Sequence, residues 1–302
     1  MKIYEKSVGK RRIGQTSSHE LPSRGSDWWD RGTHDSPASV AERFTITNAL
    51  WKKAASGLPP DKFAIISDVH GNLAALESVL DYLESRSIDK IYCLGDVVGY
   101  GPHPAECLSL IKERQIPCLR GNHEAYVLAA QIPGDLHEDA VVGIRYSRKC
   151  LSAADRKFIK SWPDEMVVHG MSFVHASYPD PTDWDYLSDQ RAARGHLAAQ
   201  PTDISFFGHT HRQGGFQCDG DRVEELIPDR SVHLSERIVM AINPGSVGQP
   251  RDADQRAALA IYCRGLGIVE FHRVAYDIDR TLAALAEAGF PPRMGHRLGV
   301  GR

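Results

Sequence analysis

The chain has 302 residues, of which 42% are hydrophobic and 25% are charged, and this composition argues against a disordered, collagen-like or coiled-coil chain. No apolar run approaches the roughly 20 residues that a membrane-spanning helix needs. No apolar segment follows the Arg11-Arg12 pair, which argues against export. The 6 cysteines include no C-x-x-C pair and favour free thiols in a reducing compartment. We therefore expect a cytoplasmic protein with no membrane partner.

Charge is divided unevenly along the chain. Residues 1–60 carry 10 Lys and Arg against 6 Asp and Glu, whereas the remaining residues carry 26 against 33. An acidic body offers no extended basic surface along which a nucleic-acid backbone could run. The charge pattern therefore argues against bulk nucleic-acid binding, and it leaves room for a small anionic substrate if metal ions concentrate positive charge locally.

Residues 1–60 are predicted to form an N-terminal extension. Residues 1–36 are rich in Ser, Gly, Arg and His and lack apolar periodicity, which is typical of a weakly ordered tail. Ser36-Pro37 then resembles a helix start, and apolar residues recur at helical spacing from Val40 to Trp51. Since apolar stripes are usually buried, we expect this helix to pack on the body of the protein, with partner binding as the alternative.

From residue 62 onward, short apolar runs alternate with amphipathic segments, as buried strands and their covering helices do. Strands are predicted at residues 63–67, 91–94, 117–119, 165–169, 171–175, 204–207, 238–242, 258–263 and 268–274. Helices are predicted at residues 73–83, 104–114, 137–149, 187–199 and 278–288. This order predicts an α/β sandwich with sheets inside and helices outside over residues 61–290, followed by a C-terminal tail at residues 291–302.

Five short polar motifs come directly after predicted strands. Loops that leave neighbouring strand ends often lead into one crevice, so their side chains can meet. Each motif alone is more often loop capping than a binding site, but all five in order are hard to produce by accident. The motifs are Asp68-Val69-His70-Gly71-Asn72, Gly95-Asp96-Val97-Val98-Gly99-Tyr100-Gly101, Arg120-Gly121-Asn122-His123-Glu124, His175, and Gly208-His209-Thr210-His211.

The side chains of these motifs offer nitrogen and oxygen ligands and no thiolate. Asp68 and His70 can face one cation, and the two oxygens of Asp96 can bridge two cations. Such a set suits divalent Mn²⁺, Fe²⁺ or Zn²⁺ in a hydrolytic site rather than a structural zinc. The seven candidate ligands are Asp68, His70, Asp96, Asn122, His175, His209 and His211.

Taken together, the motifs resemble the full motif series of the calcineurin-like metallophosphoesterase superfamily, over about residues 62–275 and most closely its compact bacterial and archaeal members. The resemblance implies a four-layer α/β/β/α sandwich of two mixed β-sheets flanked by helices. It also implies two divalent metal ions per chain, with Mn²⁺ expected first and Fe, Zn, Ni or Co as alternatives. It places Asp68, His70, Asp96 and His211 on the first ion and Asp96, Asn122, His175 and His209 on the second.

The resemblance further implies that a hydroxide bridging the two ions attacks phosphorus in line. Asp96 would be the bridging ligand, and His123 would be the catalytic histidine that stabilises the transition state or protonates the leaving oxygen. Independently of the resemblance, His123 is the motif histidine that has no ligand role, which fits a general acid.

One departure from the pattern bears on the substrate. Eukaryotic-type Ser/Thr protein phosphatases carry an Asp and an Arg where this chain has Gly99 and Tyr100, and that Arg grips a doubly charged phosphomonoester. We therefore expect a phosphodiesterase that acts on nucleotide-type or small diesters. A phosphomonoesterase, a Ser/Thr protein phosphatase and a catalytically silent scaffold of the same fold are the alternatives.

The partner expected for this site is a small phosphate ester, and the oligomeric state is left open. For the two arginines among its candidate contacts, an ordinary surface charge is the alternative. Asn243-Pro244-Gly245-Ser246 is expected to be a turn that shapes the floor of the site. The candidate substrate contacts are Arg120, Asn122, Tyr100 and Arg251.

Overall fold

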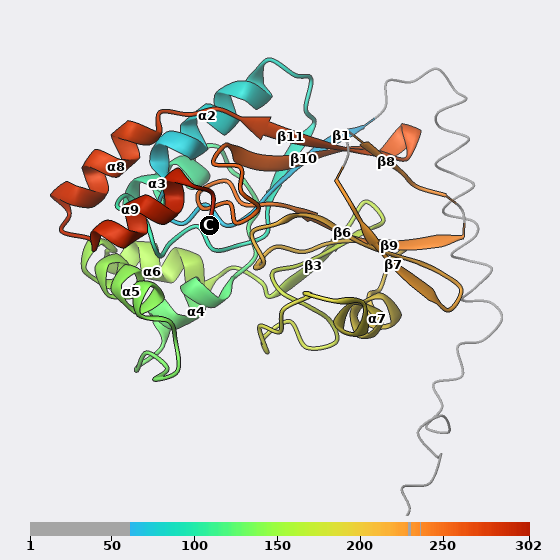
Figure 1. The fold of residues 1–302 in the computed structure, drawn as a ribbon, viewed down its shortest axis with the longest axis horizontal. Coiled ribbons are helices and arrows are strands. Elements are labelled where there is room, and N and C mark those ends of the chain that lie inside the picture. Colours follow the sequence, from blue (N-terminus) through green and yellow to red (C-terminus); the bar gives the residue numbers. More distant parts are fainter. Residues whose placement is uncertain (1–60, 229–230, 236) are drawn as a thin grey trace, which may run out of the picture. The chain divides into compact units, whose positions relative to one another are not determined.

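The computed structural model describes residues 61–228, 231–235 and 237–302, drawn in colour in Figure 1. The N-terminal tail and the helix expected near residues 37–56 lie outside these residues. Among the helices that the described ranges contain, none is long and apolar enough to cross a membrane.

The first of two sheets has five strands in the order β2-β1-β10-β11-β8. β1 and β2 run parallel, and the remaining neighbours pair antiparallel, so the sheet is mixed. The strands are β1 (Lys62–Ile66), β2 (Lys90–Cys93), β8 (Ser231–His233), β10 (Ala257–Cys263) and β11 (Ile268–Val274).

The second sheet has six strands in the order β3-β4-β5-β9-β6-β7. β4, β5 and β9 run parallel to one another, and β3 on one side and β6 and β7 on the other continue the sheet with antiparallel pairing. The strands are β3 (Glu165–Val168), β4 (Met171–Val174), β5 (Ile204–Phe206), β6 (Gln213–Asp219), β7 (Arg222–Leu226) and β9 (Ile238–Pro244).

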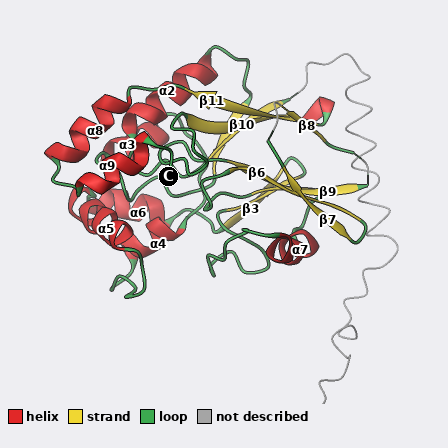
Figure 2. Ribbon diagram, viewed as in Figure 1, coloured by secondary structure: helices red, strands yellow, loops and turns green. Residues whose placement is uncertain are grey.

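Helices cover the outer faces of both sheets. Figure 2 shows most helices gathered beside the five-stranded sheet, whereas α7 contacts β6, β7 and β9 of the other sheet. The helices are α2 (Leu73–Glu84), α3 (Pro104–Glu113), α4 (Asn122–Leu128), α5 (Glu138–Cys150), α6 (Ala153–Lys160), α7 (Gln190–Ala199), α8 (Ile278–Glu287) and α9 (Pro292–Gly299), with a short 3₁₀ turn at Arg264–Leu266.

Alternation along β1 shows how the layers are held together. Ala64 and Ile66 pack in a core with residues of α2 and α3, whereas Phe63 and Ile65 pack in a second core with Phe173 of the other sheet. Successive side chains of a strand point to opposite faces, so one five-residue strand contributes to both cores. The predicted four-layer α/β/β/α sandwich of two mixed sheets is confirmed.

Several elements differ from the sequence prediction. The strand expected at residues 117–119 is reduced to a single bridge between Cys93 and Cys118. Residues 291–302, expected to be a tail, contain α9, and its Met294 and Leu298 are buried in a cluster with α8 residues. The prediction missed α4, α6, β6, β7 and β8, which are short or carry many polar residues, so their apolar periodicity is weak.

Candidate metal centre

The loops that carry the five motifs leave the two sheets at adjacent strand ends. Backbone pairing continues past the ends of β1 and β2, since the Asp68 N–H donates to the Gly95 carbonyl at 3.1 Å and the His70 N–H to the Asp96 carbonyl at 2.9 Å. In the other sheet the Gly208 N–H donates to the His175 carbonyl at 2.8 Å. The parallel strands therefore bring their following residues together, as the sequence predicted.

Five of the seven candidate ligands have a left-handed backbone. This region is sparsely populated by residues other than glycine, and such strain concentrates at functional sites. The sharp turns aim successive side chains into one space instead of along the strand. The residues are Asp68 (φ 54°), His70 (φ 47°), Asp96 (φ 53°), His209 (φ 65°) and His211 (φ 59°).

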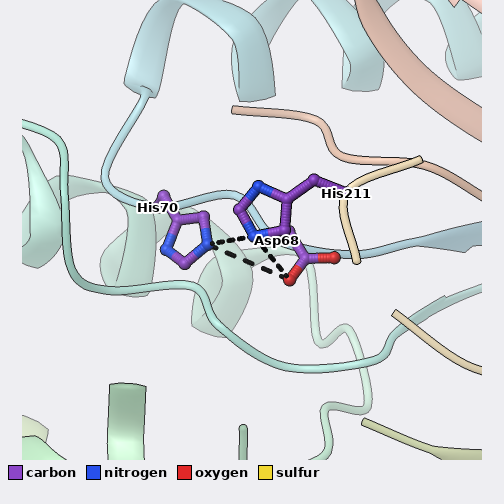
Figure 3. A group of neighbouring side chains, drawn as sticks. All are labelled: Asp68, His70 and His211. Carbon is purple, nitrogen blue, oxygen red and sulfur yellow. Dashed lines mark hydrogen bonds and ion pairs between the residues drawn. The ribbon is translucent and has the colours of Figure 1, made fainter. Parts of the chain in front are cut away.

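One cluster of side chains consists of Asp68, His70 and His211, which Figure 3 shows converging. The Nε2 atoms of His70 and His211 lie 3.0 Å apart, and His211 Nε2 lies 3.4 Å from Asp68 Oδ1. His70 Nε2 also lies 3.7 Å from Oδ2 of Asp96, which joins this cluster to its neighbour.

Backbone carbonyls orient the histidine rings. The Nδ1 atoms of His70, His175 and His211 lie 3.0, 2.9 and 2.7 Å from the carbonyl oxygens of Val98, Leu94 and Gln249. A carbonyl only accepts, so these Nδ1 atoms carry the proton, and burial lowers the pKa of His70 and His211 well below the usual range. The two Nε2 lone pairs at 3.0 Å thus face each other, an arrangement that a cation between them would stabilise.

The second cluster consists of Asp96, His175 and His209, with Asn122 beside it. His175 Nε2 lies 3.3 Å from Asp96 Oδ2 and 3.1 Å from Asn122 Oδ1. The other Asp96 oxygen, Oδ1, accepts the His123 N–H at 2.9 Å, which fixes the carboxylate. Oδ2 of Asp96 is therefore shared by the two clusters.

The electrostatics of the pair of clusters favours positive charge. Burial raises the pKa of Asp68 to about 7. Although burial opposes it, the charge of His175 holds the pKa of Asp96 well below its usual range. Against its own burial, the Asp96 and Asp68 carboxylates raise the pKa of His175 to about 10. The carboxylates thus stabilise a positive charge between them, either as a proton on His175 or as a cation.

Two buried atoms of the candidate ligands lack the hydrogen bonds that such atoms normally make. Asp68 Oδ1 and His209 Nε2 have no hydrogen-bond partner in the part of the chain that the structure describes. An unsatisfied buried polar atom costs about 1–3 kcal/mol, so such atoms are rare unless a ligand completes them. With only N and O donors present, the two clusters fit divalent cations.

His123 lies against both clusters and stands outside the two expected ligand sets, although its ring also forms a third group of converging ligand atoms with His70 and Asp96. Its Nε2 lies 4.0 Å from Asp96 Oδ2, and its ring centroid lies 4.7 Å from that of His70. Burial lowers the pKa of His123 to about 4, so the imidazole is neutral at pH 7 and carries one N–H. A Cβ at Gly99 would lie 2.0 Å from His123 Nδ1, so the orienting Asp of the protein phosphatases has no room here.

Glu124 is a functional residue whose role the sequence did not reveal. It is fully buried, and its two carboxylate oxygens accept the backbone N–H groups of Asp96, Val97, Val98 and Gly121 at 2.8, 2.8, 3.1 and 2.9 Å. Glu124 therefore holds the loop of the shared ligand Asp96. The available signal was its place three residues after Gly121, where a capping-box glutamate stands.

The end of β9 and the turn that follows it join the two halves of the site. Asn243 Nδ2 donates to the Gly208 carbonyl at 2.8 Å, and Ser246 Oγ donates to the Asp68 carbonyl at 2.8 Å. The turn thus underlies the site, as expected from the sequence.

The candidate substrate contacts fall into two groups. Tyr100, Asn122 and Arg251 line a cavity of about 100 Å³ together with Asp96 and His123. Arg251 reaches it with its guanidinium 5.6 Å from the Tyr100 ring centroid, and its Nη2 donates to Gln249 Oε1 at 2.8 Å.

Arg120 is not brought to this cavity. Its guanidinium instead makes two hydrogen bonds to Asp164, at 2.9 and 2.7 Å. The alternative of an ordinary surface charge therefore describes Arg120, whereas Arg251 lies beside the candidate ligands.

The region that carries the candidate metal ligands also matches known proteins. Residues 62–264 match the model of the calcineurin-like phosphoesterase superfamily domain. An uncharacterised protein of Methanocaldococcus jannaschii is 33% identical over 243 residues, which are 79% of this chain and 98% of that protein. The crystal structure of a metallophosphoesterase from Sphaerobacter thermophilus is 33% identical, with a TM-score of 0.69 over 80% of this chain and 100% of that chain. A symmetrical bis(5'-nucleosyl)-tetraphosphatase of Paracidovorax citrulli is 34% identical over 102 residues, which are 32% of this chain and 34% of that protein.

Proposed function

Because this chain belongs to the calcineurin-like phosphoesterase superfamily, we propose that it is a metal-dependent hydrolase of phosphate esters, and that its substrates are nucleotide-type or other small diesters. The observation that carries the proposal is the position of Asp96 Oδ2, which lies 3.7 Å from His70 Nε2 and 3.3 Å from His175 Nε2. A carboxylate oxygen placed between two groups of imidazoles fits a bridge between two cations.

Two divalent ions held at this site would polarise the phosphoryl oxygens and lower the pKa of a bound water. Manganese is the ion we expect first, and Fe, Zn, Ni and Co accept the same donors. The first ion would be held by Asp68, His70, Asp96 and His211, and the second by Asp96, Asn122, His175 and His209.

The remaining side chains would act on the substrate directly. His123 would donate its N–H to the oxygen of the leaving group, since it lines the cavity and has no ligand role. Arg251 would pair with a non-bridging phosphate oxygen, because its buried Nε has no partner among the described residues. Glu124 would keep the Asp96 loop in place through its four accepted hydrogen bonds.

A diester is the proposed substrate class because Tyr100 stands where the protein phosphatases carry a phosphate-gripping Arg. The similarity to the Paracidovorax citrulli relative, a symmetrical bis(5'-nucleosyl)-tetraphosphatase, supports a nucleotide-type substrate. A phosphomonoesterase is the second candidate, because Arg251 supplies one cation in the cavity that could pair with a dianionic phosphate.

The test is to strip the full chain with a chelator, reload it with Mn²⁺, and compare hydrolysis of bis-p-nitrophenyl phosphate and p-nitrophenyl phosphate. Two Mn²⁺ per chain and faster hydrolysis of the diester are the expected result. His233→Ala is the matched control, because His233 is exposed on β8 and has no role in the site. A reloaded protein that hydrolyses neither ester would support the catalytically silent scaffold, and faster hydrolysis of the monoester would support the second candidate.

A further inference from the structure

A second, larger cavity adjoins the candidate metal centre. Its volume is about 800 Å³, within the range of roughly 300–1,000 Å³ that is usual for small-molecule sites. Thr210, which stands between the candidate ligands His209 and His211, lines this cavity. Tyr186 lines both this cavity and the smaller one that contains His123. The larger cavity therefore borders the smaller one at Tyr186.

Two exposed apolar side chains border this cavity. The large apolar side chains that are exposed in the described ranges are Val167, Tyr186, Ile227, Leu266 and Val300. Tyr186 is 51% exposed and Ile227 is 82% exposed, and both line the larger cavity. Exposed apolar side chains that border one hollow indicate a surface which is covered when a ligand binds.

Tyr186 is placed to act as a stacking surface. Its ring stacks on that of His209, with centroids 4.1 Å apart and an angle of 28° between the planes. The half-exposed ring is thereby fixed in orientation beside the metal centre. A fixed aromatic ring of this kind favours a flat aromatic group of the ligand over a flexible aliphatic one.

The charged side chains that line the cavity are two arginines, Arg212 and Arg273, and three carboxylates, Glu225, Asp252 and Asp254. Arg273, which also lines it, is occupied by Asp252 and by Gln213 Oε1. Arg212 is exposed, lines the cavity and pairs with no carboxylate among the described residues. Because the carboxylates outnumber the arginines, the lining favours an uncharged organic group over a second anionic one.

We infer that the larger cavity binds the group that stays on phosphorus when the diester is cleaved, and that this group is a nucleoside whose base stacks on Tyr186. The inference rests on the proposed function. His123 lines the smaller cavity, so the leaving group departs there, and the second organic group extends past Tyr186 and Thr210. A monoester carries no such group and would leave the larger cavity without a role.

Two esters with the same leaving group test this inference in the full-length, Mn²⁺-loaded protein. The first is the p-nitrophenyl ester of thymidine 5'-monophosphate, and the second is methyl p-nitrophenyl phosphate. Both release p-nitrophenol, so only the retained group differs. We expect kcat/KM to favour the thymidine ester by about tenfold or more, which is the gain expected from one base stacked on an aromatic ring.

Variants of the cavity should reduce this preference through KM. Tyr186→Ala should lower the preference for the thymidine ester about tenfold. Tyr186→Phe should keep the wild-type preference, because the aromatic ring remains. Ile227→Ser changes the wall of the cavity at a residue that does not stack on His209. The side chains of Ile227 and Tyr186 are both exposed, so we expect these variants to keep the fold. Leu266→Ala is the matched control, since Leu266 is a half-exposed apolar residue that does not line the cavity.

An equilibrium measurement separates binding from catalysis. Thymidine 5'-monophosphate, titrated into the full chain and followed by NMR, should bind about tenfold more weakly to Tyr186→Ala than to Tyr186→Phe. Equal kcat/KM for the two esters, or a preference that Tyr186→Ala and Ile227→Ser both leave unchanged, would overturn the inference while leaving the proposed function intact. Failure to hydrolyse either ester would instead refute the proposed function, and the titration would still decide whether the cavity takes a nucleoside.

Discussion

Replacing Glu124 by Gln tests how the candidate metal centre is held. The two oxygens of Glu124 each accept two backbone N–H groups, and the side chain is fully buried. Glutamine has nearly the same shape but keeps only one oxygen, so its NH₂ group must face two N–H donors. The change therefore isolates the hydrogen bonds from the packing.

The magnitude follows from the two donors that lose their acceptor. Each buried unsatisfied group costs about 1–3 kcal/mol, so Glu124→Gln should lower the free energy of unfolding by about 2–6 kcal/mol. Because one of the four donors is the N–H of Asp96, the shared carboxylate should also shift, and Mn²⁺ affinity should fall.

Urea denaturation measures the first effect, and titration of the stripped protein with Mn²⁺ measures the second. Glu113→Gln is the control, because Glu113 is exposed near the end of α3. A loss of stability below about 1 kcal/mol for Glu124→Gln, with unchanged Mn²⁺ affinity, would show that Glu124 does not hold the Asp96 loop.

Three further predictions concern other residues of the protein. Asp96→Asn should reduce the metal content at both positions together, whereas His123→Ala should keep two ions per chain by elemental analysis and lower turnover about 10²–10⁴-fold; an emptied site in His123→Ala would contradict its assigned role. Gly99→Ala should lower turnover with the metal content retained, because the new Cβ would lie 2.0 Å from His123 Nδ1, and unchanged kcat would refute this crowding. Burial lowers the pKa of His196 to about 3, below its value of about 6.5 in the unfolded chain, so stability should be full above pH 6.5 and fall as the pH drops toward 3. Its slope is about 1.4 kcal/mol per pH unit, and denaturation of His196→Gln, measured over the same pH range, should show a shallower slope.

The sequence predicted the sandwich well because its buried strands carry strong local signals. β1, β4 and β10 are apolar on both faces, as strands between two layers must be, and their runs are visible without any tertiary information. β6 escaped prediction because two of its seven residues are glycines and three are polar, so that its burial depends on pairing with β7 and β9. The helix α4 was also missed, because its first residues, Asn122 and His123, belong to a polar motif that was interpreted as a loop.

The sequence by itself determined which residue types can bind metal ions, since a motif of N and O donors after a strand is local information. Only the tertiary structure decided that Asp96 lies between two clusters, that Arg251 reaches the cavity and that Arg120 is held by Asp164. It also decided that Tyr186, from a loop that no motif marked, stacks on His209. The physical reason is distance: a donor set depends on residue identity, whereas contacts between residues tens of positions apart depend on how the two sheets pack against each other.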